Sequence, residues 1–252
     1  MQTIREPSRI QGAWEREYAR LARAIVSVLP SDMTSLVDAG CGRGRLTVPL
    51  ASLKPDIQID AIDRFEGPYA PHRERLREAL KAGDLAQRVR IVSGDALTEL
   101  RRYPSGSLDV IVSSELLPEL DETSLARFFA GCFRVLREGG VTAHAFLSPI
   151  PRTEGQKLTI EADSDPRWTA HPPTEWFSPS PESVRGALVA AGFRAVHVET
   201  LRGRLRFTER AAQEQLREWA VRASYYSTHE GALRVHGLEL PDWTILSGSR
   251  LR

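Results

Sequence analysis

Acidic and glycine residues at alternate positions stand out first, because their spacing suits the close binding of a ligand. Asp38, Gly40, Gly42 and Gly44 occupy every second position at the end of a short apolar run. Alternate glycines let the backbone approach a ligand and turn tightly into a helix, whose first amides favour an anion. A dinucleotide fingerprint needs glycine at position 45, where Arg45 stands. The spacing therefore disfavours NAD.

Two more acidic residues follow later apolar runs. Asp63 comes 21 positions after Gly42, and Asp95 follows Gly94. With these elements in order, the chain resembles the class I, Rossmann-like S-adenosylmethionine-dependent methyltransferases, whose first motif is acidic-x-Gly-x-Gly-x-Gly. The resemblance implies that the Asp63 carboxylate accepts both ribose hydroxyls of the cofactor. It also implies that Asp95 accepts from the adenine amino group and that the Ala96 amide donates to a ring nitrogen.

The resemblance covers about residues 35–147. Residues 108–115 resemble the strand and loop that present the methyl group, and residues 133–140 resemble the helix-to-strand step of the family. The loop at 114–119 reads Ser-Glu-Leu-Leu-Pro-Glu rather than the Asn/Asp-Pro-Pro-Tyr type, which disfavours exocyclic amines as acceptors. No metal-ligand cluster appears in the sequence. The cofactor contacts that the resemblance implies are Asp38, Gly40, Cys41, Gly42, Gly44, Asp63, Arg64, Asp95, Ala96 and Ser113.

The acceptor side of the reaction needs alignment and, for some acceptors, a base. Methyl transfer is an in-line displacement, so the protein mainly holds a nucleophile close to the methyl group. A hydroxyl or ammonium acceptor also loses a proton, which a histidine or carboxylate can take. Glu115 is the best placed candidate, because the end of the fourth strand faces the reactive end of the cofactor in this family. Helix capping or packing is its alternative role.

Four histidine and glutamate residues elsewhere are further candidates. His229, beside Tyr225 and Tyr226, is the second catalytic candidate, and a core aromatic pair with exposed polar neighbours is its alternative. His144 lies inside a predicted strand and fits a hydrogen-bonded core histidine. The remaining candidate bases are His171 and Glu230.

The elements that must position these residues follow from the apolar pattern. Short apolar runs alternate with longer amphipathic ones, as in strands joined by crossover helices. Seven strands are predicted, over residues 34–39, 57–62, 89–92, 108–113, 141–147, 195–201 and 243–251. One predicted helix covers 122–137 and stops at Gly139-Gly140, and another follows residues 178–181 and ends near Gly192. The predicted fold class is α/β, with a doubly wound, mostly parallel seven-stranded sheet, an antiparallel last strand, an N-terminal helix and helical cap insertions.

A single methyltransferase domain over residues 1–252 is predicted, with three additions to its sheet. Residues 1–30 contain an amphipathic helix whose apolar residues fit either core packing or a lid over the cofactor. Residues 148–177 and 206–240 are candidate caps over the substrate, the second with a helix around 209–223.

Composition and charge limit the partners. The chain has 252 residues, 41% of them hydrophobic, and a formal net charge of +1, which gives no global field for holding a polyanion. A nucleic-acid enzyme is therefore disfavoured, and a small-molecule methyl acceptor is expected. One exception is a run of arginines whose alternate spacing could put three guanidinia on one strand face: Arg202, Arg204, Arg206 and Arg210. Such a face either binds an anionic substrate or, more commonly, is a solvated charged surface.

The compartment is read from the cysteines and the N-terminus. Charges scattered through the first thirty residues fit neither a signal peptide nor a membrane span. Cys41 and Cys132, in a cofactor loop and a helix, are not expected to form a disulfide. We expect a cytoplasmic protein, and the sequence leaves its oligomeric state open.

The leading hypothesis is S-adenosylmethionine-dependent methyl transfer to a small-molecule O, N or C nucleophile. The alternatives are a protein or RNA methyltransferase, which the arginine run would serve, and a non-catalytic module that retains the cofactor. A nucleotide-dependent oxidoreductase is disfavoured by the dinucleotide spacing. Fold-level analogy does not choose the acceptor.

Overall fold

The computed structural model describes residues 1–169 and 179–251. The chain divides into two compact units, each built from three stretches that are distant in sequence. The first unit takes Met1–Glu17, Leu147–Trp176 and Thr200–Trp243, and the second takes Tyr18–Phe146, Phe177–Glu199 and Thr244–Arg252. The described parts of both predicted cap insertions belong to the first unit. The single domain stays a prediction.

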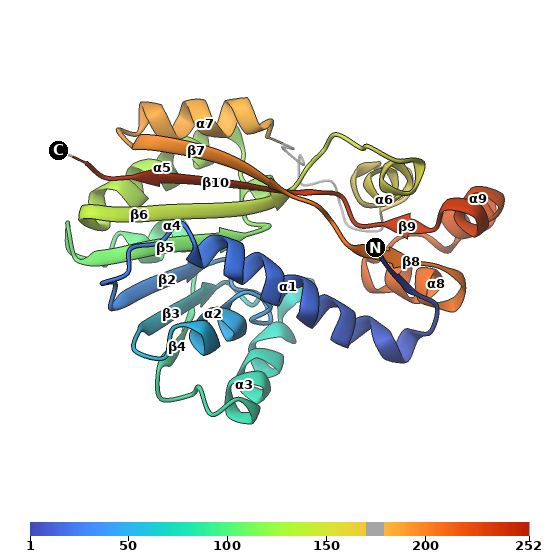
Figure 1. The fold of residues 1–252 in the computed structure, drawn as a ribbon, viewed down its shortest axis with the longest axis horizontal. Coiled ribbons are helices and arrows are strands. Elements are labelled where there is room, and N and C mark those ends of the chain that lie inside the picture. The colour runs from blue at the N-terminus through green and yellow to red at the C-terminus, as the bar shows by residue number, and fades with distance from the viewer. Residues whose placement is uncertain (170–178, 252) are drawn as a thin grey trace. The chain divides into compact units, whose positions relative to one another are not determined.

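A seven-stranded sheet forms the centre of the second unit (Figure 1). Its strand order is β4-β3-β2-β5-β6-β10-β7. The strands are β2 (Ser35–Ala39), β3 (Gln58–Asp63), β4 (Val89–Ser93), β5 (Leu108–Ser114), β6 (Leu136–Leu147), β7 (Arg194–Leu201) and β10 (Trp243–Ser249). The five strands from β4 to β6 in this order pair in parallel with one another. The chain order reverses between β2 and β5, and ligands bind at such a switch point, outside the carboxyl ends of the strands.

The last strand, β10, runs against the others. Its backbone bonds to β6 link Gly139 and Gly140 with Arg250, while Ser148 is bonded to Asp242, so the two strands are antiparallel. The β10 arrow accordingly points opposite to the β6 arrow in Figure 1. The predicted fold class, including the antiparallel last strand, is confirmed.

The central strands are buried on both faces, which explains their continuous apolar sequence. Val37 in β2 and Ile111 and Val112 in β5 have no exposed surface. A parallel sheet needs such strands because crossover helices cover both of its faces. The predicted strand positions agree with the observed ones because this burial pattern is local in the sequence.

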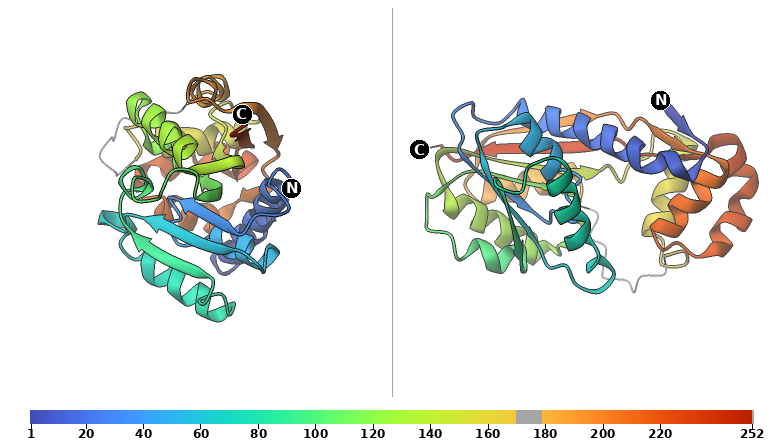
Figure 2. Two further views of the ribbon diagram at one scale, coloured as in Figure 1. Left: turned by 90° about the vertical axis from the view of Figure 1, so that its left-hand side faces the viewer. Right: turned by 90° about the horizontal axis from the view of Figure 1, so that it is seen from below.

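Helices cover the sheet on its two faces (Figures 1 and 2). Those of the sheet unit are α1 (Ile10–Val26, from Tyr18 onward), α2 (Thr47–Leu53), α3 (His72–Ala82), α4 (Ala96–Leu100), α5 (Glu122–Val135) and α7 (Pro181–Ala190). α4, α5 and α7 pack on one face through a shared core that includes Phe128, Phe129 and Leu188. α7 begins as predicted, with the Ser180 hydroxyl accepting from the Ser183 amide. No helix in the described ranges is long and apolar enough to cross a membrane.

The junction between α5 and β6 differs from the prediction. The helix ends at Val135, and β6 begins at Leu136, four residues before Gly140. Leu136 pairs with Leu108 and Val141 pairs with Val110, so residues 137–140 bulge outward opposite a single residue of β5. A Cβ on Gly140 would lie 2.9 Å from the Arg137 carbonyl oxygen. The glycine pair therefore forms a strand bulge and does not terminate the helix, because the strand backbone passes too close for a side chain.

Besides the start of α1, the described residues of the first unit form a small sheet and the helices α6, α8 and α9, of which the sequence pattern predicted only a part. The sheet order is β1-β8-β9, and the elements are β1 (Gln2–Ile4), α6 (Glu154–Ser164), β8 (Leu205–Phe207), α8 (Glu209–Glu218), α9 (Ala223–His236) and β9 (Leu238–Glu239). The single helix expected around 209–223 is α8 alone, with α9 as a second helix after it. Strands of two or three residues carry too little periodicity to be predicted.

The arginine run does not form the predicted strand face. β7 ends at Leu201 and β8 begins at Leu205, so Arg202 and Arg204 lie between the strands and only Arg206 is inside one. Arg210 lies in α8. A strand face needs continuous extended backbone, and the chain leaves that conformation at Arg202.

Candidate functional site

A glycine loop follows β2 at the switch point of the sheet. Gly40, Gly42 and Gly44 have φ values of +72°, +51° and +81°, which side-chain-bearing residues seldom adopt. A Cβ on Gly44 would lie 2.4 Å from Leu76 Cδ1, and one on Gly40 would lie 3.1 Å from Leu116. The glycines are therefore required both for the turn and for the close packing of the loop.

Asp63, at the end of β3, is bound to this loop. Its Oδ2 accepts from the Gly42 amide at 2.9 Å, and its Oδ1 accepts from the Phe65 amide at 3.0 Å. The Gly40 and Cys41 amides also bond to the Ile62 carbonyl. A carboxylate oxygen has two lone pairs, so each Asp63 oxygen retains one acceptor position. A pair of hydroxyls, such as those of a ribose, fits these two positions.

Asp38 lies fully buried beneath the loop. The Thr47 hydroxyl donates to its Oδ2 at 2.6 Å, but its Oδ1 has no partner within the described residues. Burial raises the pKa of Asp38 to about 7, and the Asp63 charge adds to this while the Thr47 bond opposes it. A buried acceptor without a donor is costly. The residues therefore fit a ligand or water that brings a hydrogen-bond donor to the loop.

The adenine-binding turn predicted at Asp95 and Ala96 has free groups of the right kind. The Asp95 Oδ1 accepts from the Thr98 amide at 2.9 Å and so begins α4. Asp95 is half-buried and its second oxygen is not used by this cap. Ala96 is the first residue of α4, and first-turn amides have no partner within their helix. An acceptor and a donor thus lie next to each other at the end of β4.

Three further residues, Arg64, Cys41 and Ser113, were predicted to contact the cofactor. Arg64 is exposed. Cys41 is buried, and burial raises the pKa of its thiol well above the ordinary range, so it contributes to the loop through its backbone. The Ser113 side chain is fully buried and its hydroxyl is bonded to His144 Nδ1 at 2.7 Å. The Ser113 side chain therefore takes part in hydrogen bonding within the core. Its contact with a cofactor stays a prediction.

Glu115 follows β5 in an unusual backbone conformation. Its φ is +59°, while its amide donates to the Ala145 carbonyl at 2.9 Å. A residue with a Cβ is strained in this region, and such strain tends to occur at functional sites. The conformation distinguishes Glu115 from an ordinary residue of a strand end.

Tyr18 meets the Glu115 loop from α1, and the sequence analysis did not identify it as a site residue. Its ring lies under the Arg45 guanidinium at 5.7 Å, and its hydroxyl is hydrogen-bonded to Ser114. Burial raises the pKa of Tyr18 to about 12, with Arg45 opposing the rise and Glu115 adding to it. α1, the glycine loop and the end of β5 therefore meet at one place. The amphipathic pattern of α1 did not indicate this meeting point, because core packing alone explains the pattern.

His72 is a second site residue that the sequence did not indicate. It begins α3, and its Nδ1 would lie 3.6 Å from a Cβ on Gly42. Burial lowers the pKa of His72, and the neighbouring Arg43 lowers it further. A neutral imidazole beside the glycine loop can donate or accept a hydrogen bond there.

The strain at Glu115 predicts a stability difference between two variants. Glu115→Gly removes both the side chain and the Cβ strain, whereas Glu115→Ala removes the side chain and keeps the strain. We expect the glycine variant to exceed the alanine variant by about 1 kcal/mol in free energy of unfolding, measured by urea denaturation. Any side-chain contact of Glu115 cancels in this comparison. A more stable alanine variant would show that the conformation is unstrained.

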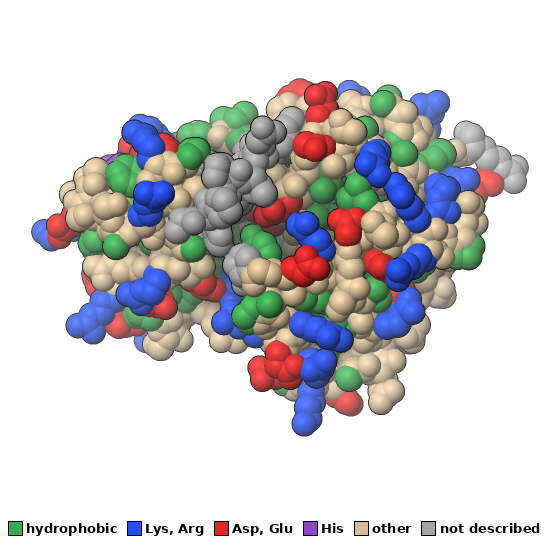
Figure 3. Space-filling model, turned by 180° about the vertical axis from the view of Figure 1, so that it is seen from behind, with side chains coloured by type: hydrophobic (Ala, Val, Ile, Leu, Met, Phe, Trp, Pro, Cys, Tyr) green, Lys and Arg blue, Asp and Glu red, His purple; other side chains and the backbone are tan. Residues whose placement is uncertain are grey.

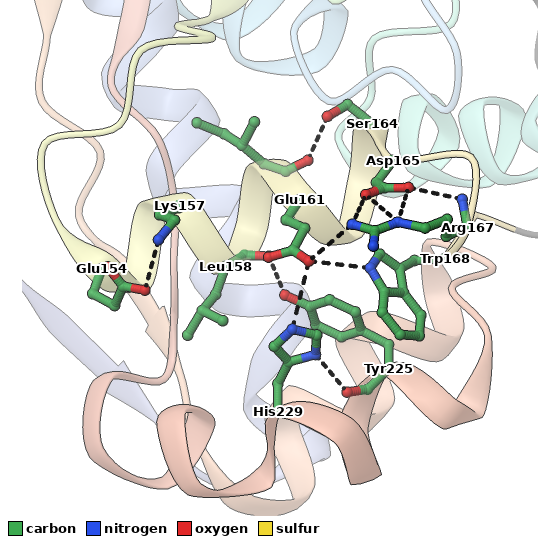
Figure 4. Close-up of polar contacts among 11 residues, drawn as sticks. Glu154, Lys157, Leu158, Glu161, Ser164, Asp165, Arg167, Trp168, Tyr225 and His229 are labelled. Atoms are coloured by element: carbon green, nitrogen blue, oxygen red, sulfur yellow. Dashed lines mark hydrogen bonds and ion pairs between the residues drawn. The ribbon is translucent and has the colours of Figure 1, made fainter.

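His229 lies in the first unit within an aromatic cluster that Glu161 joins (Figure 4). Its Nδ1 is 3.0 Å from the Tyr225 carbonyl oxygen, and its Nε2 is 3.5 Å from Glu161 Oε1. Trp168 Nε1 donates to the same Glu161 oxygen at 3.1 Å. The Tyr225 and His229 rings stack with centroids 4.2 Å apart. A carbonyl only accepts, so Nδ1 carries a proton, and in this arrangement both ring nitrogens face protein groups.

The other candidate bases have separate surroundings. His144 is fully buried between Ser113 and Thr142, and burial lowers its pKa to about 3, so it is a neutral core histidine. Glu230 is exposed and pairs with Arg234 at 3.1 Å. His171 lies outside the described residues. Glu115 is therefore the candidate base that the structure places beside the glycine loop.

A family model and two sequence relatives match parts of the chain, and the family model lies within the second unit. Residues 36–140 match the family described as "Methyltransferase domain". A malonyl-(acyl-carrier protein) O-methyltransferase of Geobacter sulfurreducens is 31% identical over 165 residues, which are 65% of this chain and 57% of that protein. A ribosomal RNA small subunit methyltransferase G of Kineococcus radiotolerans is 25% identical over 166 residues, which are 61% of this chain and 65% of that protein. The matched part of the chain thus spans less than two thirds of each relative.

A solved structure resembles nearly the whole chain. It is a SAM-dependent methyltransferase from Archaeoglobus fulgidus with a TM-score of 0.58 and 19% identity, and the match covers 94% of each chain. At this identity the likeness shows the fold alone. The sequence relatives include enzymes named for a small acyl group and for ribosomal RNA, so the comparisons leave the acceptor open.

Proposed function

We propose that this chain, a member of the class I, Rossmann-like S-adenosylmethionine-dependent methyltransferases, transfers the methyl group to an O, N or C nucleophile of a small molecule. The observation that carries the proposal is the junction of three segments around the glycine loop. Asp63 binds the Gly42 amide, Asp38 keeps an unpaired acceptor beneath the loop, and Glu115 follows β5 in a strained conformation.

The cofactor is S-adenosylmethionine, which supplies an electrophilic methyl group on a sulfonium. The free acceptor positions of Asp63 suit its ribose hydroxyls. The spare oxygen of Asp95 and the first amide of α4 suit its adenine. These contacts hold the reactive end near the carboxyl ends of β2 and β5, where positioning contributes most to an in-line transfer.

On the acceptor side, Glu115 is the proposed base. The Glu115 carboxylate would take the acceptor's proton, from an ammonium before it attacks or from a hydroxyl as it attacks. As the acceptor's lone pair forms the bond to the methyl carbon, the methyl–sulfur bond would break with its electrons going to sulfur, and S-adenosylhomocysteine would leave. The buried Tyr18 hydroxyl and Arg45 position the loop that bears Glu115. His229, with both nitrogens facing protein groups, is proposed to hold the fold of the first unit through Glu161.

A small-molecule acceptor is supported by the charge distribution. The net charge is +1, and basic and acidic side chains are interspersed over the face in Figure 3. RNA binding depends on clustered cations that neutralise several phosphates. The relative that acts on ribosomal RNA makes RNA the second candidate. The buried thiols Cys41 and Cys132 support a reducing compartment such as the cytoplasm.

The first experiment is isothermal titration with S-adenosylmethionine, S-adenosylhomocysteine and NAD in parallel. We expect micromolar binding of the first two and none of NAD, because the loop lacks the dinucleotide spacing. Binding of NAD alone would overturn the family assignment. Release of S-adenosylhomocysteine is then measured against a panel of small hydroxyl, amine and carbon acids and, separately, against ribosomal RNA. Transfer to RNA alone contradicts the small-molecule acceptor.

Glu115→Gln tests the acceptor role with the acceptor that the panel identifies. The amide preserves the size of the side chain but cannot take a proton, so we expect kcat to fall by about 100-fold or more while cofactor affinity changes by less than about threefold. Asp121→Asn, which alters an exposed helix cap beyond the loop, is the control and should leave both values nearly unchanged. Equal losses in turnover and cofactor affinity would remove Glu115 from the acceptor side.

A further inference from the structure

A pocket of the first unit, apart from the glycine loop, is lined by four arginines. Its volume is about 430 Å³, and the arginines are Arg5, Arg206, Arg210 and Arg234. Among the described lining residues Glu209 is the one acidic residue, and Tyr226 contributes an aromatic ring. We call these four residues with their cavity the arginine pocket.

Three segments that are distant in sequence form the arginine pocket. β1 and β8 pair in parallel with Thr3 opposite Arg206, so Arg5 follows the strand that lies beside Arg206. The Ala211 amide donates to the Arg5 carbonyl and joins the start of α8 to β1. Arg210 lies in the first turn of α8, and Arg234 lies in the last turn of α9. Figure 1 shows β1, β8, α8 and α9 together in this unit.

Ion pairs with protein carboxylates neutralise part of this charge. Arg5 and Glu209 are 3.9 Å apart with side chains 70% and 62% exposed, a separation and an exposure at which ion pairs are weak. Arg234 pairs with Glu230 on the exposed surface of α9. Within the described ranges Arg210 has no ion pair. Arg206 lies 3.9 Å from Glu239, whose side chain is 13% exposed. Four guanidinia therefore have three carboxylates nearby, of which Glu209 is among the described lining residues, and the cavity keeps a net positive charge.

Arg206 is fixed in place by the backbone. Its Nε donates to the His236 carbonyl at 2.7 Å and its Nη2 donates to the Val235 carbonyl at 2.6 Å. These bonds satisfy carbonyls at the end of α9, which have no partner within the helix. Arg206 thereby links β8 to α9 and holds the arginine pocket together.

We propose that the arginine pocket binds the phosphate groups of a small molecule, as a phosphomonoester or a diphosphate. A guanidinium forms paired hydrogen bonds with phosphate oxygens, and several guanidinia in one cavity match a group with two or more negative charges. The volume suits a small molecule, and Tyr226 offers its ring to an organic part. An extended nucleic acid fits less well, because Arg202 and Arg204 do not line the pocket. This proposal is independent of the cofactor site and of the proposed methyl transfer.

The test uses isothermal titration at low ionic strength with inorganic pyrophosphate and with glycerol 3-phosphate. We expect the wild type to bind at least one of them at millimolar concentration or below, and Arg210→Gln/Arg234→Gln to weaken that binding by about tenfold or more. Both residues are exposed and neither holds the backbone as Arg206 does, so the variant should fold. The control Arg185→Gln/Arg217→Gln removes the same charge from exposed positions of α7 and α8, and should change binding by less than about twofold.

The outcomes separate the proposal from its alternatives. Tighter glycerol 3-phosphate assigns the arginine pocket to a phosphorylated organic molecule, and tighter pyrophosphate assigns it to a diphosphate; both support it. No binding by the wild type up to about 10 mM, or equal losses in the control, overturns it. Tighter binding of a 12-nucleotide RNA with a steep salt dependence also overturns it. S-adenosylmethionine affinity, measured on the same variants, should stay unchanged and so tests the cofactor site separately.

Discussion

Replacing Asp63 with alanine is expected to lower the affinity for S-adenosylmethionine by about 100-fold or more. The substitution removes the two free acceptor positions that suit the ribose hydroxyls, and a hydrogen bond to a charged group contributes about 1.5–3 kcal/mol. It also removes the bond that holds the Gly42 amide, so the glycine loop loses its link to the end of β3. The measurement is isothermal titration with S-adenosylmethionine and S-adenosylhomocysteine.

The matched control is Asp60→Ala, which makes the same change three residues earlier on β3. Asp60 pairs with Arg90 and Tyr103 and has no bond to the glycine loop. Its loss should change cofactor affinity by less than about twofold, because Asp60 contacts Arg90 on β4 and Tyr103 rather than the glycine loop. Equal effects of the two substitutions would move the ribose site away from Asp63.

Gly42→Val provides an independent check of the same site. The φ of +51° strains valine, and a Cβ at this position faces His72. We expect the branched side chain to fill the space that the cofactor needs and to abolish measurable binding. Thermal unfolding of the variant establishes that it is folded. Wild-type affinity in a folded Gly42→Val protein would place the cofactor elsewhere.

Without cofactor, the Asp38→Asn variant is expected to gain stability relative to the wild-type protein as the pH rises. The folded-state pKa of about 7 is raised above the ordinary value of 3.8. Folding therefore favours the protonated carboxyl, whose contribution to stability is complete below about pH 4 and is lost as the pH passes through 7. For Asp38→Asn minus wild type, the difference in free energy of unfolding should grow by roughly 2–3 kcal/mol between pH 5 and pH 8. Urea denaturation at the two pH values measures it.

Thr47→Val tests the pKa of Asp38 by removing the hydrogen-bond donor of that carboxyl. The Thr47 hydroxyl donates to Asp38 and lowers its pKa, and valine has nearly the same shape without the hydroxyl. The variant should therefore lose stability between pH 5 and pH 8 more steeply than the wild type, because the pKa of Asp38 rises further. Identical pH dependence in the wild type and Asp38→Asn would show that Asp38 titrates normally.

Local sequence patterns predicted most of the sheet and the position of the glycine loop. Strands such as β2 and β5 are buried on both faces, so their apolar runs are visible in sequence. The spacing of Gly40, Gly42 and Gly44 likewise reflects a local requirement, because the tight turn needs positive φ at these three nearby positions. The pattern failed at Gly139-Gly140, where a Cβ on Gly140 would meet both the carbonyl of Arg137 in the same strand and the carbonyl of Asp109 on β5.

The sequence by itself determined the order of the strands along the chain, the glycine loop and the acidic residues at the strand ends, because each depends on near neighbours. Only the tertiary structure decided which distant residues join them. Tyr18 reaches Ser114 from a helix almost a hundred positions away, and Arg5 and Arg234 meet from opposite ends of the chain. It also decided that His229 turns both nitrogens toward protein groups. Such contacts depend on how whole helices and strands pack together. The spacing of residues within a short segment does not contain that information.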